Sequence, residues 1–141
     1  MTRPFSLRME NDTHERLRAR AQKLELSASQ LANRYVREGL TMDEFPEISF
    51  VSTPEGRRAV LASRPRIQVI DLVATWQGER QDIESTAKYF EVPETDVRGA
   101  LRYYAAYKNE LDEAIRKHRE AQANFEQVLA RRSARARRAT A

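Results

Sequence analysis

Residues 4–9 read PFSLRM, and this stretch decides how the N-terminal third of the chain can fold. Apolar Phe5, Leu7 and Met9 alternate with more polar neighbours, which is the period of two that a half-buried strand requires. The alternation predicts a short strand with one wet face and one face that needs to be covered. The wet face carries Pro4, Ser6 and Arg8.

Two short helices are expected directly after this strand. Residues 11–13 read NDT, which are helix-capping side chains, and apolar residues then recur at helical spacing to about residue 24. Ser27 and Ser29 offer a second N-cap, and the stripe of the second helix ends near Gly39. Glu25 lies in the turn between the helices, where Gly or Asn would fit more easily if φ is positive.

These three elements cannot form a stable unit alone. A single strand leaves both of its edges unpaired, and two short helices have no third layer to cover their apolar stripe. A second copy of the chain solves both problems, so we expect a homodimer built from residues 1–41. Its core is predicted to consist of Phe5, Leu7, Leu17, Ala21, Ala32, Val36 and Leu40.

Residues 3–40 resemble the ribbon-helix-helix repressors of the MetJ/Arc/CopG superfamily, with FSLR in the strand and LSASQLA at the turn. The resemblance implies an antiparallel ribbon that enters the major groove of double-stranded operator DNA, while the start of the second helix holds a phosphate. By position, the residues facing the bases would be Pro4, Ser6 and Arg8. The residues contacting phosphate would be Arg3, Ser27, Ala28 and Ser29.

The middle of the chain reads as a linker followed by a small domain. Residues 42–47, MDEFPE, have no periodicity and predict the linker. Residues 48–51 and 58–61 flank the turn sequence STPEG and predict a hairpin. Helical patterns follow at 67–77, at about 82–90, and in a long helix from Pro93. The stripe of this long helix is Val97, Leu101, Tyr104, Leu111 and Ile115.

Residues 48–115 resemble a small trihelical, homeodomain-like family of antitoxins associated with VapB-type systems. The similar stretches are ISF at 48–50, RAVLASRPRIQVIDL at 58–72 and VPETDVRGALRYYA at 92–105. A turn that reads Gly-Thr-Arg-Ile in that family corresponds here to residues 63–67, SRPRI, and departs from its pattern. The resemblance implies a second, antitoxin-like domain after the ribbon.

Residues 116–141 form a basic C-terminal segment. The long helix is expected to continue as RKHREAQAN, polar on every face, and then to present Phe125, Val128 and Leu129. One interpretation is a disordered basic tail that touches DNA. The other is a toxin-binding segment in which the three apolar residues anchor the contact. It would also include Arg131, Arg132, Arg135, Arg137 and Arg138.

Charge is distributed unevenly along the chain. Residues 1–40 hold eight Lys/Arg against five Asp/Glu, residues 41–115 nine against fourteen, and residues 116–141 eight against two. A basic head and a basic tail therefore flank an acidic middle, which makes the two ends the candidates for anionic partners. Aromatic residues of the acidic middle are assigned to its core, because a base-stacking surface would be accompanied by Lys and Arg. They are Trp76, Tyr89, Phe90, Tyr103 and Tyr104.

Several classes of function are disfavoured. The chain has no cysteine, no Gly-rich phosphate loop and no Ser/His/Asp arrangement, and His14 and His118 are far apart in sequence. We expect a non-enzymatic protein without cofactor or metal. An apolar N-terminal run is absent, so neither a signal peptide nor a membrane span is expected, and a cytoplasmic, nucleoid-associated location fits best.

The leading hypothesis is the antitoxin of a bacterial type II toxin–antitoxin pair. The ribbon would repress the operon, and the C-terminal segment would neutralise a cognate toxin. The family resemblance implies that this toxin is a PIN-type ribonuclease. The arginines could enter its acidic catalytic centre and take the place of magnesium. The alternatives are a stand-alone repressor or nucleoid-associated protein with a basic DNA-binding tail, and a scaffold that binds no nucleic acid. Further association of dimers through residues 48–115 is left open.

Overall fold

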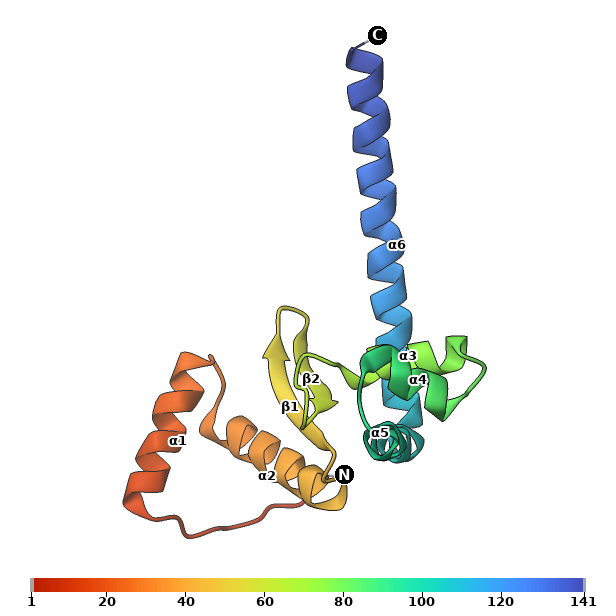
Figure 1. The fold of residues 1–141 in the computed structure, drawn as a ribbon. Helices are drawn as coiled ribbons and strands as arrows, with labels where there is room; N and C mark the ends of the chain where they lie inside the picture. Colours follow the sequence, from red (N-terminus) through yellow and green to blue (C-terminus); the bar gives the residue numbers. More distant parts are fainter. Residues whose placement is uncertain (1, 141) are drawn as a thin grey trace. The chain divides into compact units, whose positions relative to one another are not determined.

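The computed structural model describes residues 2–140 and is mainly helical, with six helices and one two-stranded antiparallel sheet (Figure 1). This confirms the prediction of a mainly α chain with a small hairpin. The chain divides into two compact units, the first ending at Glu44 and the second beginning at Phe45.

The first unit contains helices α1 (Asn11–Lys23) and α2 (Ala28–Glu44). Ser27 caps α2 reciprocally: its hydroxyl accepts from the Gln30 N–H at 3.1 Å, and Gln30 Oε1 accepts from the Ser27 N–H at 3.0 Å. In the turn before it, Glu25 adopts φ 56°, the left-handed conformation that Gly or Asn adopts more easily. The cap and the turn together fix where α2 begins.

Residues 2–10 form neither helix nor strand in the single chain, so the strand predicted over residues 4–9 is absent from it. The physical reason is that a lone strand has no neighbour for its backbone N–H and C=O groups. The apolar side chains of this segment are accordingly uncovered: Phe5 is 86% exposed and Leu7 is 65% exposed.

Helix α2 is longer than its sequence pattern predicted. It runs past Gly39 to Glu44, so residues 42–44 of the expected linker are helical. A single glycine costs a helix only about 1 kcal/mol, and the buried Thr41 hydroxyl donates to the Arg37 carbonyl at 2.8 Å within the helix. Pro46 then prevents continuation, because it lacks an N–H and restricts the residue before it.

The second unit begins with the predicted hairpin. Strands β1 (Ile48–Thr53) and β2 (Gly56–Leu61) pair antiparallel, with Ile48 opposite Leu61. Gly56 adopts φ 114° at the turn, where a side chain would be strained.

Four helices follow the hairpin: α3 (Val69–Gly78), α4 (Ile83–Phe90), α5 (Glu94–Ala106) and α6 (Lys108–Ala139). The expectation of one long helix from Pro93 is wrong, because the chain breaks at Tyr107, whose backbone lies at φ −124° and ψ 38°. The Tyr107 ring packs against Tyr103, with ring centroids 5.1 Å apart, and against Phe45. The break lets α5 and α6 each turn an apolar face to one core.

That core lies between the hairpin and the helices of the second unit. The hairpin side is closed by Phe45 and Phe50, which meet Tyr103 edge-on at centroid distances of 5.6 and 6.4 Å. Helix α6 enters the core only with its first two turns. The buried residues of the core include Ile48, Leu61, Val69, Leu72, Val73, Val97, Ala100, Tyr103, Tyr104, Leu111 and Ile115.

Candidate partner-binding surfaces

The first unit carries an apolar groove of about 640 Å³, formed by residues 7–9, α1 and α2. The groove is rimmed by the basic residues Arg16, Arg20 and Lys23. Of the seven residues predicted to form the dimer core, Ala21 is buried within the single chain, whereas Val36 and Leu40 are exposed. Four of the seven line the groove: Leu7, Leu17, Ala32 and Val36.

The residues predicted to contact DNA lie in two separate segments. Arg3, Pro4, Ser6 and Arg8 are exposed on the irregular residues 2–10, and Ser27, Ala28 and Ser29 form the start of α2. The Ser27 N–H is occupied by Gln30. Ala28 and Ser29 remain as first-turn residues, whose N–H groups have no carbonyl partner inside the helix.

Helix α6 leaves the core after Ile115, and every residue from 119 to 140 is exposed. Its 32 residues correspond to a length of about 48 Å, most of which extends beyond the other helices of the second unit (Figure 1). Leu129 lies eighteen residues after Leu111, which is five helical turns, so the two occupy the same face. The face that is buried at Leu111 and Ile115 thus continues into solvent.

The uncovered part of this face carries the predicted apolar anchor. Phe125 is 65% exposed, and Val128 and Leu129 are nearly half exposed. We call Phe125, Val128 and Leu129 the α6 stripe. A contiguous apolar patch on an isolated helix is typical of a surface that a partner covers.

Four of the five predicted arginines gather beside the α6 stripe. Arg131, Arg132, Arg135 and Arg138 surround a shallow groove of about 430 Å³ next to Val128. Arg137 lies nine residues after Val128, half a turn away on the opposite face. No acidic residue occurs between 127 and 140, so this end of α6 is uniformly cationic.

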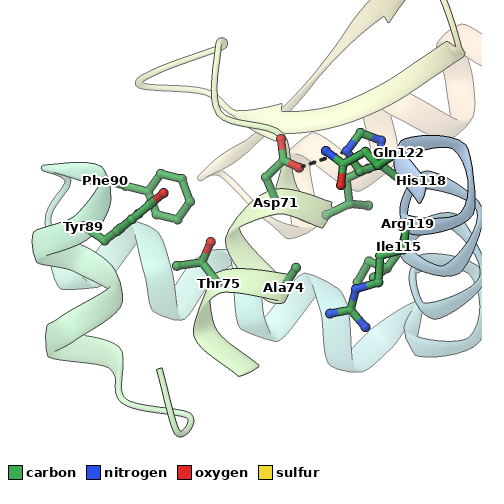
Figure 2. A pocket seen from close by; sticks show the side chains of 10 residues that line it. Asp71, Ala74, Thr75, Tyr89, Phe90, Ile115, His118, Arg119 and Gln122 are labelled. Atoms are coloured by element: carbon green, nitrogen blue, oxygen red, sulfur yellow. Dashed lines mark ion pairs between the residues drawn. The ribbon is translucent and has the colours of Figure 1, made fainter. Parts of the chain in front are cut away.

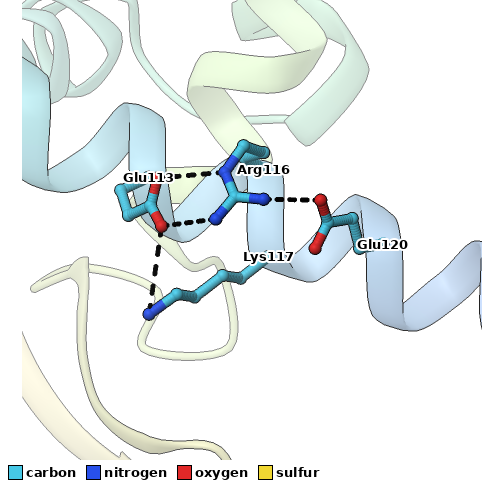
Figure 3. Close-up of polar contacts among 4 residues, drawn as sticks. All are labelled: Glu113, Arg116, Lys117 and Glu120. Carbon is cyan, nitrogen blue, oxygen red and sulfur yellow. Dashed lines mark hydrogen bonds and ion pairs between the residues drawn. The ribbon is translucent and has the colours of Figure 1, made fainter.

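The root of α6 is stiffened by charge pairs along its outer face (Figure 3). Arg116 bridges Glu113, one turn before it, and Glu120, one turn after it. Hydrogen bonding to Arg116 lowers the pKa of Glu113. Pairs at these spacings support an isolated helix, and here they span the point where α6 loses its tertiary cover.

A hydrogen-bond network joins α3, α5 and α6 where α6 begins, and Gln77 of α3 donates to the Tyr104 hydroxyl at 3.4 Å. The Tyr104 hydroxyl donates to Asp112 Oδ1 and the Lys108 ammonium donates to Asp112 Oδ2, each at 2.5 Å. These bonds, from Lys108 first and Tyr104 second, lower the pKa of Asp112. Burial, followed by the bond to Asp112, raises the pKa of Tyr104.

A third groove, of about 370 Å³, lies between α3, α4 and the part of α6 that leaves the core (Figure 2). His118 and Asp71 approach to 3.9 Å across it. Tyr89 lies on the rim of this groove and is 67% exposed, so the prediction that Tyr89 belongs to the core is wrong. Of the other aromatic residues predicted in the core, Tyr103 and Tyr104 are buried, and Trp76 and Phe90 are partly buried. Tyr89 falls outside the core because α4 already uses Thr86 and Ala87 as its buried face. We call this cavity the root groove.

Helices α4 and α5 are joined by residues 91–93 and form a helix-turn-helix, with Glu91 in the left-handed conformation at φ 55°. The second helix of such a unit reads DNA with cationic side chains. Here Arg98 pairs with Glu94 at 3.3 Å and Arg102 pairs with Glu47 at 2.9 Å. Both arginines of α5 thus have an acidic partner within the second unit, and both side chains are more than half exposed.

The turn at residues 63–67, which departs from the family pattern, holds the second unit together. Arg64 donates to the carbonyls of Phe90 and Glu91 at 2.7 and 3.2 Å, where α4 ends. The Ser63 hydroxyl donates to Asp96 Oδ2 at 2.7 Å in the first turn of α5. The sequence pattern contains no signal for these contacts, because they join residues far apart in the chain.

Comparisons with other proteins leave both resemblances resting on the quoted residues. No protein-family model matches the chain, and neither curated proteins nor solved structures contain a significant match. Among residues 2–140, no three His, Asp or Glu side chains lie close enough to hold a metal ion together. In the same part of the chain, no helix is both long and apolar enough to span a membrane.

Proposed function

We propose that the chain is the antitoxin of a bacterial type II toxin–antitoxin pair. The observation that carries this proposal is the exposed end of α6, where three apolar side chains and a cluster of arginines share one helix without any tertiary cover. Such a segment fits a partner that offers an apolar groove beside carboxylates. The acidic catalytic centre of a PIN-type ribonuclease has this chemistry, and guanidinium groups pair with carboxylates in a bidentate manner.

The DNA-binding half of the proposal rests on the first unit. The groove of about 640 Å³ offers apolar surface for a second copy, and pairing would supply the strand edges that residues 4–9 lack in the single chain. In the resulting ribbon-helix-helix dimer, Ser6 and Arg8 would face the bases, with Pro4 beside them. Arg3 and the first turn of α2 would face phosphates.

The decisive experiment co-expresses the chain with the product of the reading frame next to its gene, which the proposal expects to be a small acidic nuclease, and measures copurification. Deleting residues 122–141 should abolish the complex but leave operator binding nearly intact, because the ribbon carries the sequence readout. Phe125→Ala with Leu129→Ala keeps every charge and should weaken the complex by several kcal/mol, the usual contribution of buried anchors. A complex that survives the double substitution would refute this role of the α6 stripe.

The second candidate is a stand-alone repressor or nucleoid-associated protein with a basic arm. The uniform positive charge of residues 127–140 favours it. Under this function the 122–141 deletion should weaken binding to every DNA sequence and flatten its salt dependence, because five arginines no longer displace counterions. The double substitution should then leave DNA affinity unchanged.

A further inference from the structure

The root groove and the α6 stripe follow one another along the same side of α6. Ile115, His118, Arg119 and Gln122 form the α6 wall of the groove. Phe125 follows Gln122 by three residues and Leu129 follows it by seven, so both fall on the same rows of the helix surface. A partner that covers the α6 stripe and extends toward the core of the second unit therefore also contacts the root groove.

The opposite wall of the groove supplies an aromatic side chain suited to this contact. Tyr89 lies on α4 with its ring edge-on to Phe90 at 4.9 Å, and it is 67% exposed although it borders a cavity (Figure 2). Thr75 of α3 and Gln122 of the α6 wall add hydrogen-bonding groups to the lining of the groove. Exposed tyrosine next to a partly apolar cavity is a composition enriched at the centres of protein interfaces.

We propose that the root groove and the α6 stripe form one continuous docking surface for an acidic amphipathic helix of a protein partner. We infer a helical partner because the uncovered surface is one side of a straight helix. A second helix can pack along such a surface with the two axes about 8–10 Å apart. This inference rests on the proposed function, in which the partner is the toxin. The inference adds that the partner contacts α3 and α4 as well as the C-terminal end of α6.

Charge determines how the partner helix is oriented. Within the second unit, residues 45–115 hold twelve Asp/Glu against nine Lys/Arg, whereas the end of α6 beyond Glu126 carries five arginines and no acid. Carboxylates on the partner are attracted to the arginine end and repelled by the body. The partner helix therefore places its acidic residues beside Arg132 and Arg137, which follow Leu129 by three and eight residues on the same side of α6, and its apolar or neutral end in the root groove.

The experiment uses the full chain and the product of the reading frame next to its gene, which the proposed function expects to be the partner. Tyr89→Ala should weaken their complex about tenfold or more, as expected for a buried aromatic contact, while Tyr89→Phe should retain most of the affinity. Lys88→Ala is the matched control, because Lys88 is the neighbouring exposed residue on α4 and does not line the groove. Its affinity should stay within about twofold of wild type.

The outcomes separate this inference from the proposed function. If Phe125→Ala with Leu129→Ala disrupts the complex but Tyr89→Ala does not, the docking surface ends at the tail and the inference is overturned while the antitoxin function stands. If neither variant matters, both fail. A photoreactive side chain at position 89 should crosslink to a helical, Asp/Glu-rich peptide of the partner; a crosslink to duplex DNA instead would overturn the protein docking surface.

Discussion

The Glu47 side chain occupies the space beside Gly99 in which any other residue would place its Cβ. A Cβ built on Gly99 would lie 2.5 Å from both Cγ and Cδ of Glu47. Glu47 is held there by Arg102, and its Oε2 is buried without a hydrogen-bond partner among the described residues. This contact joins the start of the second unit to the middle of α5.

Gly99→Ala should therefore destabilise the protein, although alanine favours a helix by about 1 kcal/mol over glycine. Overpacking against Glu47 should outweigh that gain, giving a net loss of about 1 kcal/mol in urea-induced unfolding. In a Glu47→Ala background the steric conflict is absent, so Gly99→Ala should stabilise by about 1 kcal/mol. Equal destabilisation in both backgrounds would show that Glu47 is not the cause.

Acidification should loosen the attachment of α6. The pKa of Asp112 is lowered below its ordinary value of 3.8, first by Lys108 and then by Tyr104. The stability this carboxylate contributes is present above pH 3.8 and is lost as the pH falls through its lower pKa in the folded state. Thermal unfolding of Asp112→Asn should thus depend less on pH in this window, and Tyr104→Phe should show an intermediate slope. Wild-type and Asp112→Asn curves with the same slope would contradict this role.

Leu7→Asp should abolish dimerisation without unfolding the single chain. Leu7 is 65% exposed in the chain alone but is predicted in the dimer core, where an unpaired carboxylate is costly. Sedimentation should report a monomer whose helical circular dichroism matches wild type. Ser6→Asp is the matched control, because the same charge on the wet face should leave the dimer intact; a dimeric Leu7→Asp protein would mean that the strand register is inverted.

Arg8→Ala should lower affinity for the DNA upstream of the gene by about 1–3 kcal/mol per half-site, if Arg8 reads a base in a bidentate manner. Arg8 is exposed, so its loss should not affect folding. Arg3→Ala should instead lower the affinity for all DNA sequences to the same extent, as expected for a phosphate contact. The measurement compares specific and nonspecific duplexes at fixed salt, and an unchanged ratio for Arg8→Ala would remove it from base readout.

Sequence alone predicted the elements whose signals are local. The hairpin follows from STPEG between two β-type runs, and the start of α2 follows from Ser27, one of the two N-cap candidates; the reciprocal contact with Gln30 appears only in the structure. Helix α2 ends later than its sequence pattern predicts, because a glycine in a helix is a weak stop and Pro46 is the effective one. Local rules thus located elements better than their ends.

Tertiary structure decided what depends on contacts between distant residues. The helix predicted from Pro93 breaks at Tyr107, where its ring packs on Phe45 and Tyr103, and no propensity scale contains that packing. Tyr89 reads as a core residue in its helical pattern, yet α4 turns Thr86 and Ala87 inward instead. The sequence shows the apolar residues of the C-terminal segment, but only the fold places Phe125 and Leu129 in line with a groove on α3 and α4. The physical reason is that helical periodicity specifies which residues share a face, whereas the packing of neighbouring helices decides which part of that face is covered.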